Sequence, residues 1–243
     1  MYLIVDLGNT LVKLFLYKKS ECIVEQKVVL PLFIDIAESL IKNHPDIEAL
    51  IYSDVSNNSG DFFEKLSGQF PIVSVHSEMQ LPFKNSYKSP STLGTDRLVL
   101  VAAACKSYPN TNVLIIDLGS CITYDFLDSN NTYQGGAISP GFDMRYKALH
   151  QFTGNLPFLA SGKVEKFEGK TTEESIHAGV YFGILDEIKS KIEYYDHNYD
   201  SLTVILTGGD TNKLPKTLKN SIFAQSNFLA EGMFHLLKLN IDS

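Results

Sequence analysis

The stretch YLIVDLGNT at positions 2–10 decides the fold, because its pattern returns as VLIIDLGS at positions 113–120. In each copy an apolar run ends in Asp-Leu-Gly, and a second apolar run follows at residues 11–17 or 122–127. This spacing predicts two hairpins, each with a buried first strand that ends in a carboxylate. A single Asp-x-Gly most often marks an ordinary turn, but two copies, one near the start of each half, indicate duplication.

Both predicted turns carry residue types that suit a phosphate-bearing ligand. An Asp at the end of a strand can hold a metal ion or its water, and Gly lets the backbone come close to a bound group. Hydroxyl and amide side chains that can donate to phosphate oxygens follow in both copies: Asn9, Thr10, Ser120 and Thr123. Two such hairpins facing each other would hold a nucleotide in a cleft between two lobes.

Composition excludes several classes of protein. The 243 residues, 44% of them hydrophobic, can form one large domain or two of ordinary size with a real core. No apolar run reaches the ~18 residues of a membrane span, and Asp6 comes too early for a signal peptide, so we expect a cytoplasmic protein with no membrane partner. The net charge of -7 opposes general binding to DNA or RNA. Cys22, Cys105 and Cys121 are too scattered for a zinc site or a disulfide framework.

The same order of elements is predicted in both halves. In the first half we expect strands near 2–5, 11–17, 23–30, 47–53 and 72–75, and helices over 32–42 and 61–67 and from residue 94. In the second half we expect strands near 113, 122 and 133 and over 202–206, and helices over 142–151, 172–195 and 227–239. This order predicts two α/β lobes of ribonuclease-H-like type, residues 1–110 and 111–243, with the junction near Pro109.

Four ordered segments resemble type III pantothenate kinases, members of the acetate and sugar kinase, Hsc70 and actin superfamily. They are DLGNT at 6–10, GTDR at 94–97, DLGS at 117–120 and GGAISPG at 135–141, supported by Tyr87, by GKTT at 169–172 and by TGG at 207–209. Each motif alone is weak, but the ordered set spans nearly the whole chain. The resemblance implies an actin-like ATPase fold and transfer of the γ-phosphoryl group of ATP to the primary hydroxyl of pantothenate, the first step of coenzyme A synthesis.

The resemblance also implies roles for individual residues. Asp96 would be the catalytic base. Substrate contacts would come from Tyr87, Gly94, Thr95 and Arg97 and, across a dimer interface, from Thr172. Nucleotide contacts would come from Asp6, Gly8, Asn9, Thr10, Lys13, Gly119, Ser120 and Thr123. Asp6 would hold Mg²⁺ directly or through water, and Asp117 would lie near a site for K⁺ or NH₄⁺.

Taken alone, several of these residues would be interpreted as having purely structural roles. Asp96 then caps the first helical turn, Tyr87 is a packing residue, and Thr172 caps a helix ahead of Glu174. Asp117 on its own would be a second magnesium ligand. The resemblance leaves open the role of Lys147, at a position where some relatives carry a histidine, and the contacts to adenine.

Two rival functions use the same features. Another phosphotransferase or phosphohydrolase of the superfamily would share the duplicated hairpins, and the segment from Tyr87 to Arg97 argues against it. A transcription accessory factor without enzymatic activity is opposed by the acidic charge and the intact carboxylates. The resemblance further implies a homodimer with its active site at the interface, since Thr172 matches a contact donated across it. Such an interface would also explain why residues 176–185 hold more hydrophobic side chains than one core-facing stripe requires.

Overall fold

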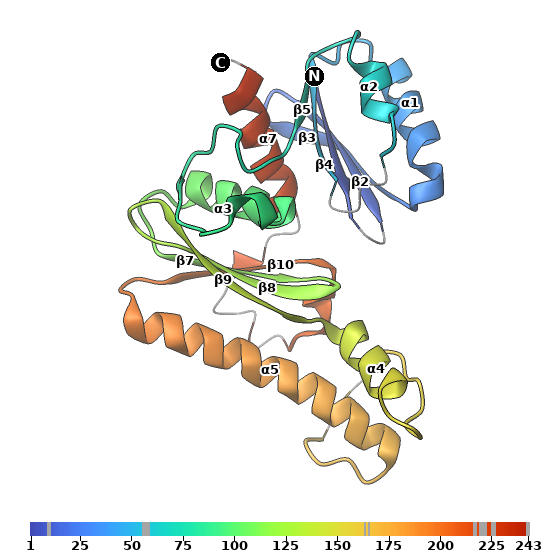
Figure 1. Ribbon diagram of the computed structural model, residues 1–243, viewed down its shortest axis with the longest axis vertical. Coiled ribbons are helices and arrows are strands. Elements are labelled where there is room, and N and C mark those ends of the chain that lie inside the picture. Colours follow the sequence, from blue (N-terminus) through green and yellow to red (C-terminus); the bar gives the residue numbers. More distant parts are fainter. Residues whose placement is uncertain are drawn as a thin grey trace. The chain divides into compact units, whose positions relative to one another are not determined.

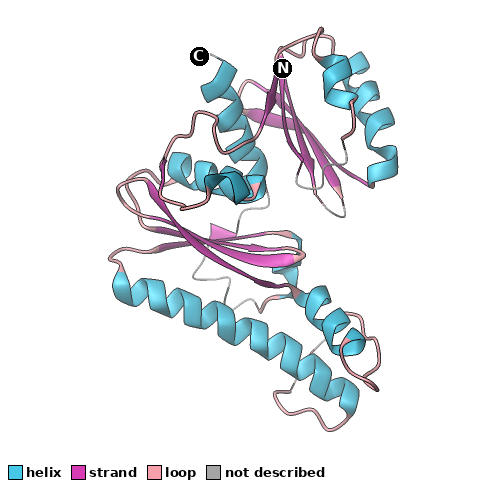
Figure 2. Ribbon diagram, viewed as in Figure 1, coloured by secondary structure: helices cyan, strands magenta, loops and turns pink. Residues whose placement is uncertain are grey.

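The computed structural model is an α/β structure with two mixed sheets (Figures 1 and 2). It describes residues 1–8, 11–54, 59–162, 164, 166–215, 218, 223–224 and 227–241. The chain divides into two compact units. Unit 1 holds Met1–Pro109, Asn131–Tyr133 and Asn227–Ser243, and unit 2 holds Asn110–Asn130 and Gln134–Ser226. The lobe boundary that we expect after residue 110 stays a prediction.

Both sheets repeat one strand order. The first sheet runs β3-β2-β1-β4-β5 and the second β11-β10-β7-β8-β9-β6. The strands of the first are β1 (Tyr2–Leu7), β2 (Val12–Lys18), β3 (Glu21–Val28), β4 (Ala49–Asp54) and β5 (Ile72–Ser74). Those of the second are β6 (Lys84–Asn85), β7 (Val113–Leu118), β8 (Cys121–Leu127), β9 (Thr132–Pro140), β10 (Thr203–Thr207) and β11 (Phe223–Ala224). In both, the first strand pairs antiparallel with its hairpin partner and parallel with the later strand, β4 or β10, so the duplicated α/β architecture is confirmed.

Helices cover these sheets as the sequence pattern predicts. Unit 1 contains α1 (Phe33–Asn43), α2 (Phe62–Leu66), α3 (Thr95–Ser107) and α7 (Phe228–Ile241), with short 3₁₀ turns η1 (Leu30–Leu32) and η2 (Pro90–Thr92). Unit 2 contains α4 (Phe142–Gln151), α5 (Thr172–Asn198) and the 3₁₀ turn η3 (Gly209–Lys213). Strands β6 and β11 were not predicted, because two residues are too few to show alternation, and neither were the 3₁₀ turns η1, η2 and η3.

Alternation along the first strand of each unit directs its Asp away from the main helical layer. Side chains of successive strand residues point to opposite faces. In β1, Leu3, Val5 and Leu7 share a buried core with α1 and α2, so Asp6 lies on the other face. In β7, the core shared with α5, which runs along one face of the sheet (Figure 1), includes the even-numbered positions around Asp117. Asp117 therefore occupies the same place in unit 2 as Asp6 in unit 1.

The last helix, α7, packs closely in unit 1. A side chain on Gly232 would lie 2.2 Å from the carbonyl oxygen of Val99 in α3, so only glycine allows this approach. The Phe234 ring stacks on Tyr17 at a centroid distance of 4.7 Å, and Lys238 Nζ lies 3.6 Å above the Tyr2 ring. The core of unit 1 is thus built from both ends of the chain.

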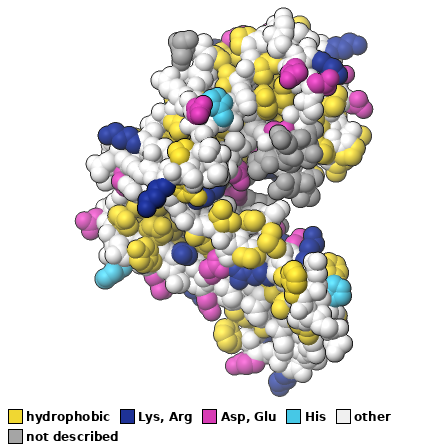
Figure 3. All heavy atoms as spheres, in the orientation of Figure 1, with side chains coloured by type: hydrophobic (Ala, Val, Ile, Leu, Met, Phe, Trp, Pro, Cys, Tyr) yellow, Lys and Arg dark blue, Asp and Glu magenta, His cyan; other side chains and the backbone are white. Residues whose placement is uncertain are grey.

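Charged side chains of both signs are interspersed on the face drawn in Figure 3. The net charge of -7 is therefore not gathered into one acidic patch there. Within the described ranges, no helix combines the length and the apolar character that crossing a bilayer would require.

Candidate active site

The first cluster of predicted residues lies where β1 and β4 end. Asp6 is in register with Lys13 on β2 and with Ser53 on β4. The Asp6 side chain is buried, and Lys13 Nζ lies 3.2 Å from its Oδ2 atom. The carboxyl ends of neighbouring parallel strands commonly carry ligand sites in open α/β sheets. The sheet thus places a buried carboxylate and a cation where a phosphate-bearing ligand could bind.

The electrostatic environment of Asp6 combines burial with charges of both signs. Burial raises the pKa of the Asp6 carboxyl, Lys13 lowers it through charge and a hydrogen bond, and the Asp96 carboxylate raises it again, leaving it above its usual range. Asp6 and Asp96 are thus close enough to repel each other. Hard carboxylate oxygens suit magnesium, which is usually held by one or two of them together with waters and substrate phosphates. Within the described residues, no three His, Cys, Asp or Glu side chains converge as a metal-binding group.

The start of α3 presents Asp96 beside this cluster. Gly94 is the N-cap of the helix, and Asp96 Oδ1 accepts a hydrogen bond of 2.8 Å from the Arg97 N–H. A Cβ atom on Gly94 would lie 2.4 Å from Asp96 Oδ1. Thr95 Oγ1 lies 2.8 Å from Ser53 Oγ at the end of β4. The GTDR motif therefore makes a tight turn in which Gly94 and the Arg97 N–H constrain the Asp96 carboxylate, while Thr95 ties the turn to β4.

Tyr87 and Arg97, both expected to contact the substrate, lie next to each other. The Arg97 side chain is only 4% exposed, and its guanidinium carbon lies 5.6 Å from the centroid of the Tyr87 ring. The Tyr87 ring in turn stacks on the buried Tyr133, with centroids 6.1 Å apart. A buried guanidinium next to a tyrosine can orient an anionic, hydroxyl-bearing substrate.

The second hairpin repeats the arrangement with different partners. Asp117 is in register with Thr123 on β8 and with Thr207 on β10. Gly208, with φ of 97°, lies so close that a Cβ atom there would be 2.4 Å from Asp117 Oδ1. Thr123 Oγ1 is buried and has no hydrogen-bond partner among the described residues. The position that holds Lys13 in unit 1 thus holds a buried hydroxyl in unit 2, whose hydrogen-bonding capacity the described residues leave unused.

The glycine-rich segment at 135–141 packs against the second hairpin turn. The Gly119 N–H donates to Cys121 O at 3.0 Å, and the Gly141 N–H donates to Ser120 O at 3.1 Å. A Cβ atom on Gly141 would lie 2.3 Å from Gly119 O. Gly141 is therefore needed for the backbone of this segment to support the turn that presents Gly119 and the exposed Ser120.

Thr172 lies on the first turn of α5, in unit 2. The helix cap is Thr171, whose side chain accepts a hydrogen bond from Glu174 N–H, so the reading of Thr172 as the cap is wrong. Thr172 instead lines a mostly apolar groove of about 700 Å³ between α4 and α5, with Leu149 and Phe152 on the α4 side. Lys147 on α4 is exposed.

Two predicted contacts, Asn9 and Thr10, lie outside the described residues. Of the described residues next to them, Gly8 donates a hydrogen bond of 3.1 Å from its N–H to Leu11 O. Sequence reasoning missed Ser53, although it predicted a strand that ends there. The signal was available, since a strand parallel to β1 must end beside Asp6.

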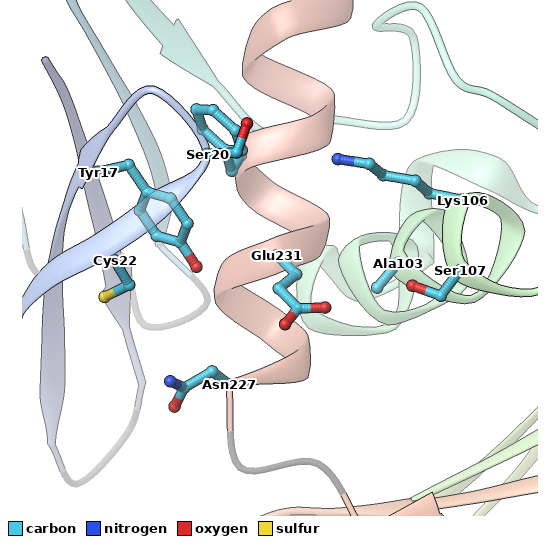
Figure 4. A pocket seen from close by; sticks show the side chains of 9 residues that line it. Tyr17, Ser20, Cys22, Ala103, Lys106, Ser107, Asn227 and Glu231 are labelled. Carbon is cyan, nitrogen blue, oxygen red and sulfur yellow. The ribbon is translucent and has the colours of Figure 1, made fainter.

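Unit 1 also contains a cavity of about 220 Å³ that is lined by residues outside the predicted site (Figure 4). Tyr17 from β2 and Glu231 from α7 both line it. Burial raises the pKa of Tyr17 well above its usual range, with smaller effects from Cys22 and Glu231, so its hydroxyl stays protonated. The residues that line this cavity include none of those predicted for the site.

Comparison with known proteins identifies the family. Residues 2–193 match the family model described as type III pantothenate kinase. The chain belongs to the type III pantothenate kinase family. It is 44% identical over 240 residues to the type III pantothenate kinase of Christiangramia forsetii, covering 99% of both chains. It is 39% identical over 241 residues to that of Bacteroides fragilis, covering 99% of this chain and 98% of its relative.

Solved structures support the fold of this family member. A putative Baf family transcriptional activator from Campylobacter jejuni matches with a TM-score of 0.66 at 20% identity, covering 99% of this chain and 100% of that one. A glucokinase from an Antarctic psychrotroph matches with a TM-score of 0.55 at 11% identity, covering 98% of both chains. At these identities the likeness shows a common fold, which sugar kinases share.

Proposed function

We propose that the protein is an ATP-dependent pantothenate kinase, which transfers the γ-phosphoryl group of ATP to the primary hydroxyl of pantothenate. The observation that carries this proposal is the cluster of Asp6, Asp96, Arg97 and Tyr87 in one unit. It occurs in a chain whose full-length relatives, at 39–44% identity, are type III pantothenate kinases.

Asp96 is proposed to act as the general base. Phosphoryl transfer depends mainly on positioning and on neutralisation of charge, and a carboxylate can accept the hydroxyl proton as the oxygen attacks phosphorus. One Asp96 oxygen is occupied by the Arg97 N–H, so the other can face the substrate hydroxyl. Arg97 and Tyr87 would orient the pantothenate carboxylate and hydroxyls.

Contacts to the nucleotide are proposed to come from residues of both hairpins. Asp6 would hold a divalent ion, which we propose is magnesium, and Lys13 would share its charge with the phosphates once that ion neutralises Asp6. Gly8, Asn9 and Thr10 would contact phosphates from the first turn. Gly119, Ser120 and the unpartnered hydroxyl of Thr123 would contact them from the second.

A monovalent cation, K⁺ or NH₄⁺, is proposed to bind near Asp117. The carboxylate of Asp117 and backbone carbonyl oxygens around Gly208 are the hard oxygen donors that such an ion takes.

The working unit is proposed to be a homodimer with the active site at the interface. The apolar groove beside Thr172 supports this, because a second copy would cover side chains such as Phe152, which is 80% exposed. Thr172 would then reach the substrate of the partner.

The rival functions have weaker support. The relatives that are named kinases cover the chain at up to 44% identity, whereas the structure described as a transcriptional activator is 20% identical. No observation favours a sugar or acetate as the acceptor over pantothenate.

The direct test is an ATP-consumption assay with pantothenate, glucose, acetate or water as acceptor, in Mg²⁺ and K⁺. Phosphopantothenate is expected from pantothenate alone. Folded protein that yields no phosphopantothenate with varied donors and monovalent salts would refute the proposal.

A further inference from the structure

A partly buried polar network in unit 2 links α5 to the segment before α4. Its centre is Glu187, in the middle of α5. Glu187 Oε1 accepts a hydrogen bond of 2.8 Å from the Tyr124 hydroxyl, and Oε2 accepts one of 3.0 Å from the Ser139 hydroxyl. Arg145 on α4 forms an ion pair with Oε2 at 2.5 Å. Three elements, β8, β9 and α4, thus meet on one carboxylate.

Arg145 extends the network to the backbone. Its Nε donates to Pro140 O at 2.9 Å, and its terminal nitrogen also donates to Ser139 Oγ at 3.1 Å. Pro140 precedes Gly141, whose N–H donates to Ser120 O. The guanidinium therefore fixes the peptide unit that supports the turn at 119–120.

The electrostatics indicate that Glu187 is ionised. Burial by itself raises the pKa of Glu187, but the hydrogen bonds from Arg145, Tyr124 and Ser139 outweigh it and hold the pKa below its usual range. The pKa of Tyr124 is well above its usual range. Burial is the larger cause, and the hydrogen bond to Glu187 adds to it. Tyr124 therefore donates its proton, and the carboxylate accepts from all three partners.

No predicted site residue belongs to this network, yet it borders two of them. Thr123, with its unpartnered hydroxyl, precedes Tyr124, and Ser120 accepts from Gly141. We propose that Glu187 is a positioning residue: through Arg145 and Ser139 it holds residues 139–141 against the turn at 119–120, which keeps that turn shaped for nucleotide phosphates. The identity of the ligand rests on the proposed function.

The test uses two disruptive variants and a matched control. Glu187→Gln keeps the size of the side chain but loses the charge that attracts Arg145. Arg145→Lys keeps a cation but loses the donor to Pro140 O, and it gives an independent answer if Glu187→Gln fails to fold. Asp186→Asn is the control, because Asp186 is 62% exposed and its ion pair with Lys189 is long, at 3.7 Å.

Hydrogen exchange measures the positioning directly and needs no ligand. The Gly141 amide is expected to exchange about 10-fold faster in both disruptive variants, since a charge-assisted hydrogen bond typically shifts an equilibrium by at least that factor. Exchange in Asp186→Asn is expected to match the wild type. Unchanged exchange of Gly141 in a folded Glu187→Gln or Arg145→Lys variant would overturn the inference.

Steady-state kinetics separates positioning from stability. In the disruptive variants KM for ATP is expected to rise about 10-fold while KM for pantothenate stays within about twofold, because only the turn is displaced. A merely structural role would reduce the active fraction, lowering kcat and leaving both KM values unchanged, and that pattern would also overturn the inference. A wild-type protein that phosphorylates nothing would refute the proposed function. The exchange rate of the Gly141 amide would still decide whether Glu187 has the positioning role.

Discussion

Ser53 Oγ and Thr95 Oγ1 lie 2.8 Å apart and join the end of β4 to the first residue of α3. Ser53 is also in register with Asp6. The pair therefore fixes the distance between the strand end that carries the proposed metal ligand and the helix that carries the proposed base, Asp96. Two hydroxyls accomplish this across 42 residues of sequence.

Ser53→Ala is expected to lower kcat about 10-fold, because loss of one hydrogen bond, worth ~1 kcal/mol, lets the start of α3 shift. Steady-state kinetics with both substrates measures this. Ser67→Ala is the matched control, since it removes a hydroxyl that donates to Glu64 O at the end of α2, in the layer on the opposite face of the sheet from Asp6. Equal kcat values for the two variants would contradict the positioning role of Ser53.

Gly94→Ala is expected to reduce turnover by about 10²-fold with little loss of stability. The added Cβ would lie 2.4 Å from Asp96 Oδ1, and the flexible carboxylate would move rather than the backbone. Gly68→Ala is the control, because a Cβ there meets nothing within 4 Å. Kinetics and thermal unfolding of both variants measure the two effects. Wild-type turnover in Gly94→Ala would show that the position of the Asp96 carboxylate is not critical.

Asp96→Asn and Asp6→Asn are expected to separate the two proposed roles. Loss of a general base costs about 10²- to 10⁴-fold in rate, so Asp96→Asn should reduce kcat and leave nucleotide binding nearly intact. Asp6→Asn should also weaken binding of the nucleotide with magnesium. Calorimetric titration with magnesium nucleotide, alongside kinetics, distinguishes them. If Asp96→Asn turned over normally, Asp96 would be only the partner of the Arg97 amide.

Asp6→Asn is also expected to stabilise the metal-free protein at neutral pH. The pKa of Asp6 is raised in the fold, so the folded state resists ionisation, and stability is lost as pH rises from the ordinary Asp value, about 3.9, through the folded value. Asparagine avoids this loss. The thermal unfolding midpoint of Asp6→Asn should exceed that of the wild type at pH 8, by about 2–4 °C for each kcal/mol gained. Below pH ~3.9 the two midpoints should match.

The opposite variant tests the cause. Lys13→Met removes the positive charge that stabilises the ionised form of buried Asp6. It should therefore lower the thermal unfolding midpoint more at pH 8, where Asp6 tends to ionise, than at pH 4. Thermal scans in the presence of a chelator measure both variants. A pH-independent difference between Asp6→Asn and the wild type would rule out the ionisation of Asp6 as the source.

The protein is expected to be a homodimer that requires K⁺ or NH₄⁺. Light scattering gives the solution mass, and turnover in sodium and potassium buffers tests the cation. Thr172→Ala should raise KM for pantothenate while the dimer persists, because one hydroxyl adds little to an apolar interface. A fully active monomer, or equal rates in both salts, would return Thr172 and Asp117 to structural roles.

Local patterns predicted much of this molecule. The repeated Asp-Leu-Gly gave both hairpins and the duplicated sheets, because alternation and turn residues act over a few positions. Contacts between segments far apart in the sequence have no such local pattern. Ser53 and Thr95, or Arg145 and Glu187, are 42 residues apart, and nothing near either residue specifies its partner. The choice of Thr171 over Thr172 as helix cap was equally hidden, since both fit the cap pattern.

The packing of α7 in unit 1 has a consequence for synthesis on the ribosome. Strands β1 and β2 emerge before unit 2, whereas the helix whose Phe234 covers Tyr17 emerges after it. At 5–20 residues per second, the chain between Pro109 and Asn227 takes roughly 6 to 24 s to make. During that interval the apolar surface of Tyr2 and Tyr17 stays uncovered, so the nascent N-terminal segment is a target for chaperones, and a truncation within α7 would expose the opposite end of the sequence.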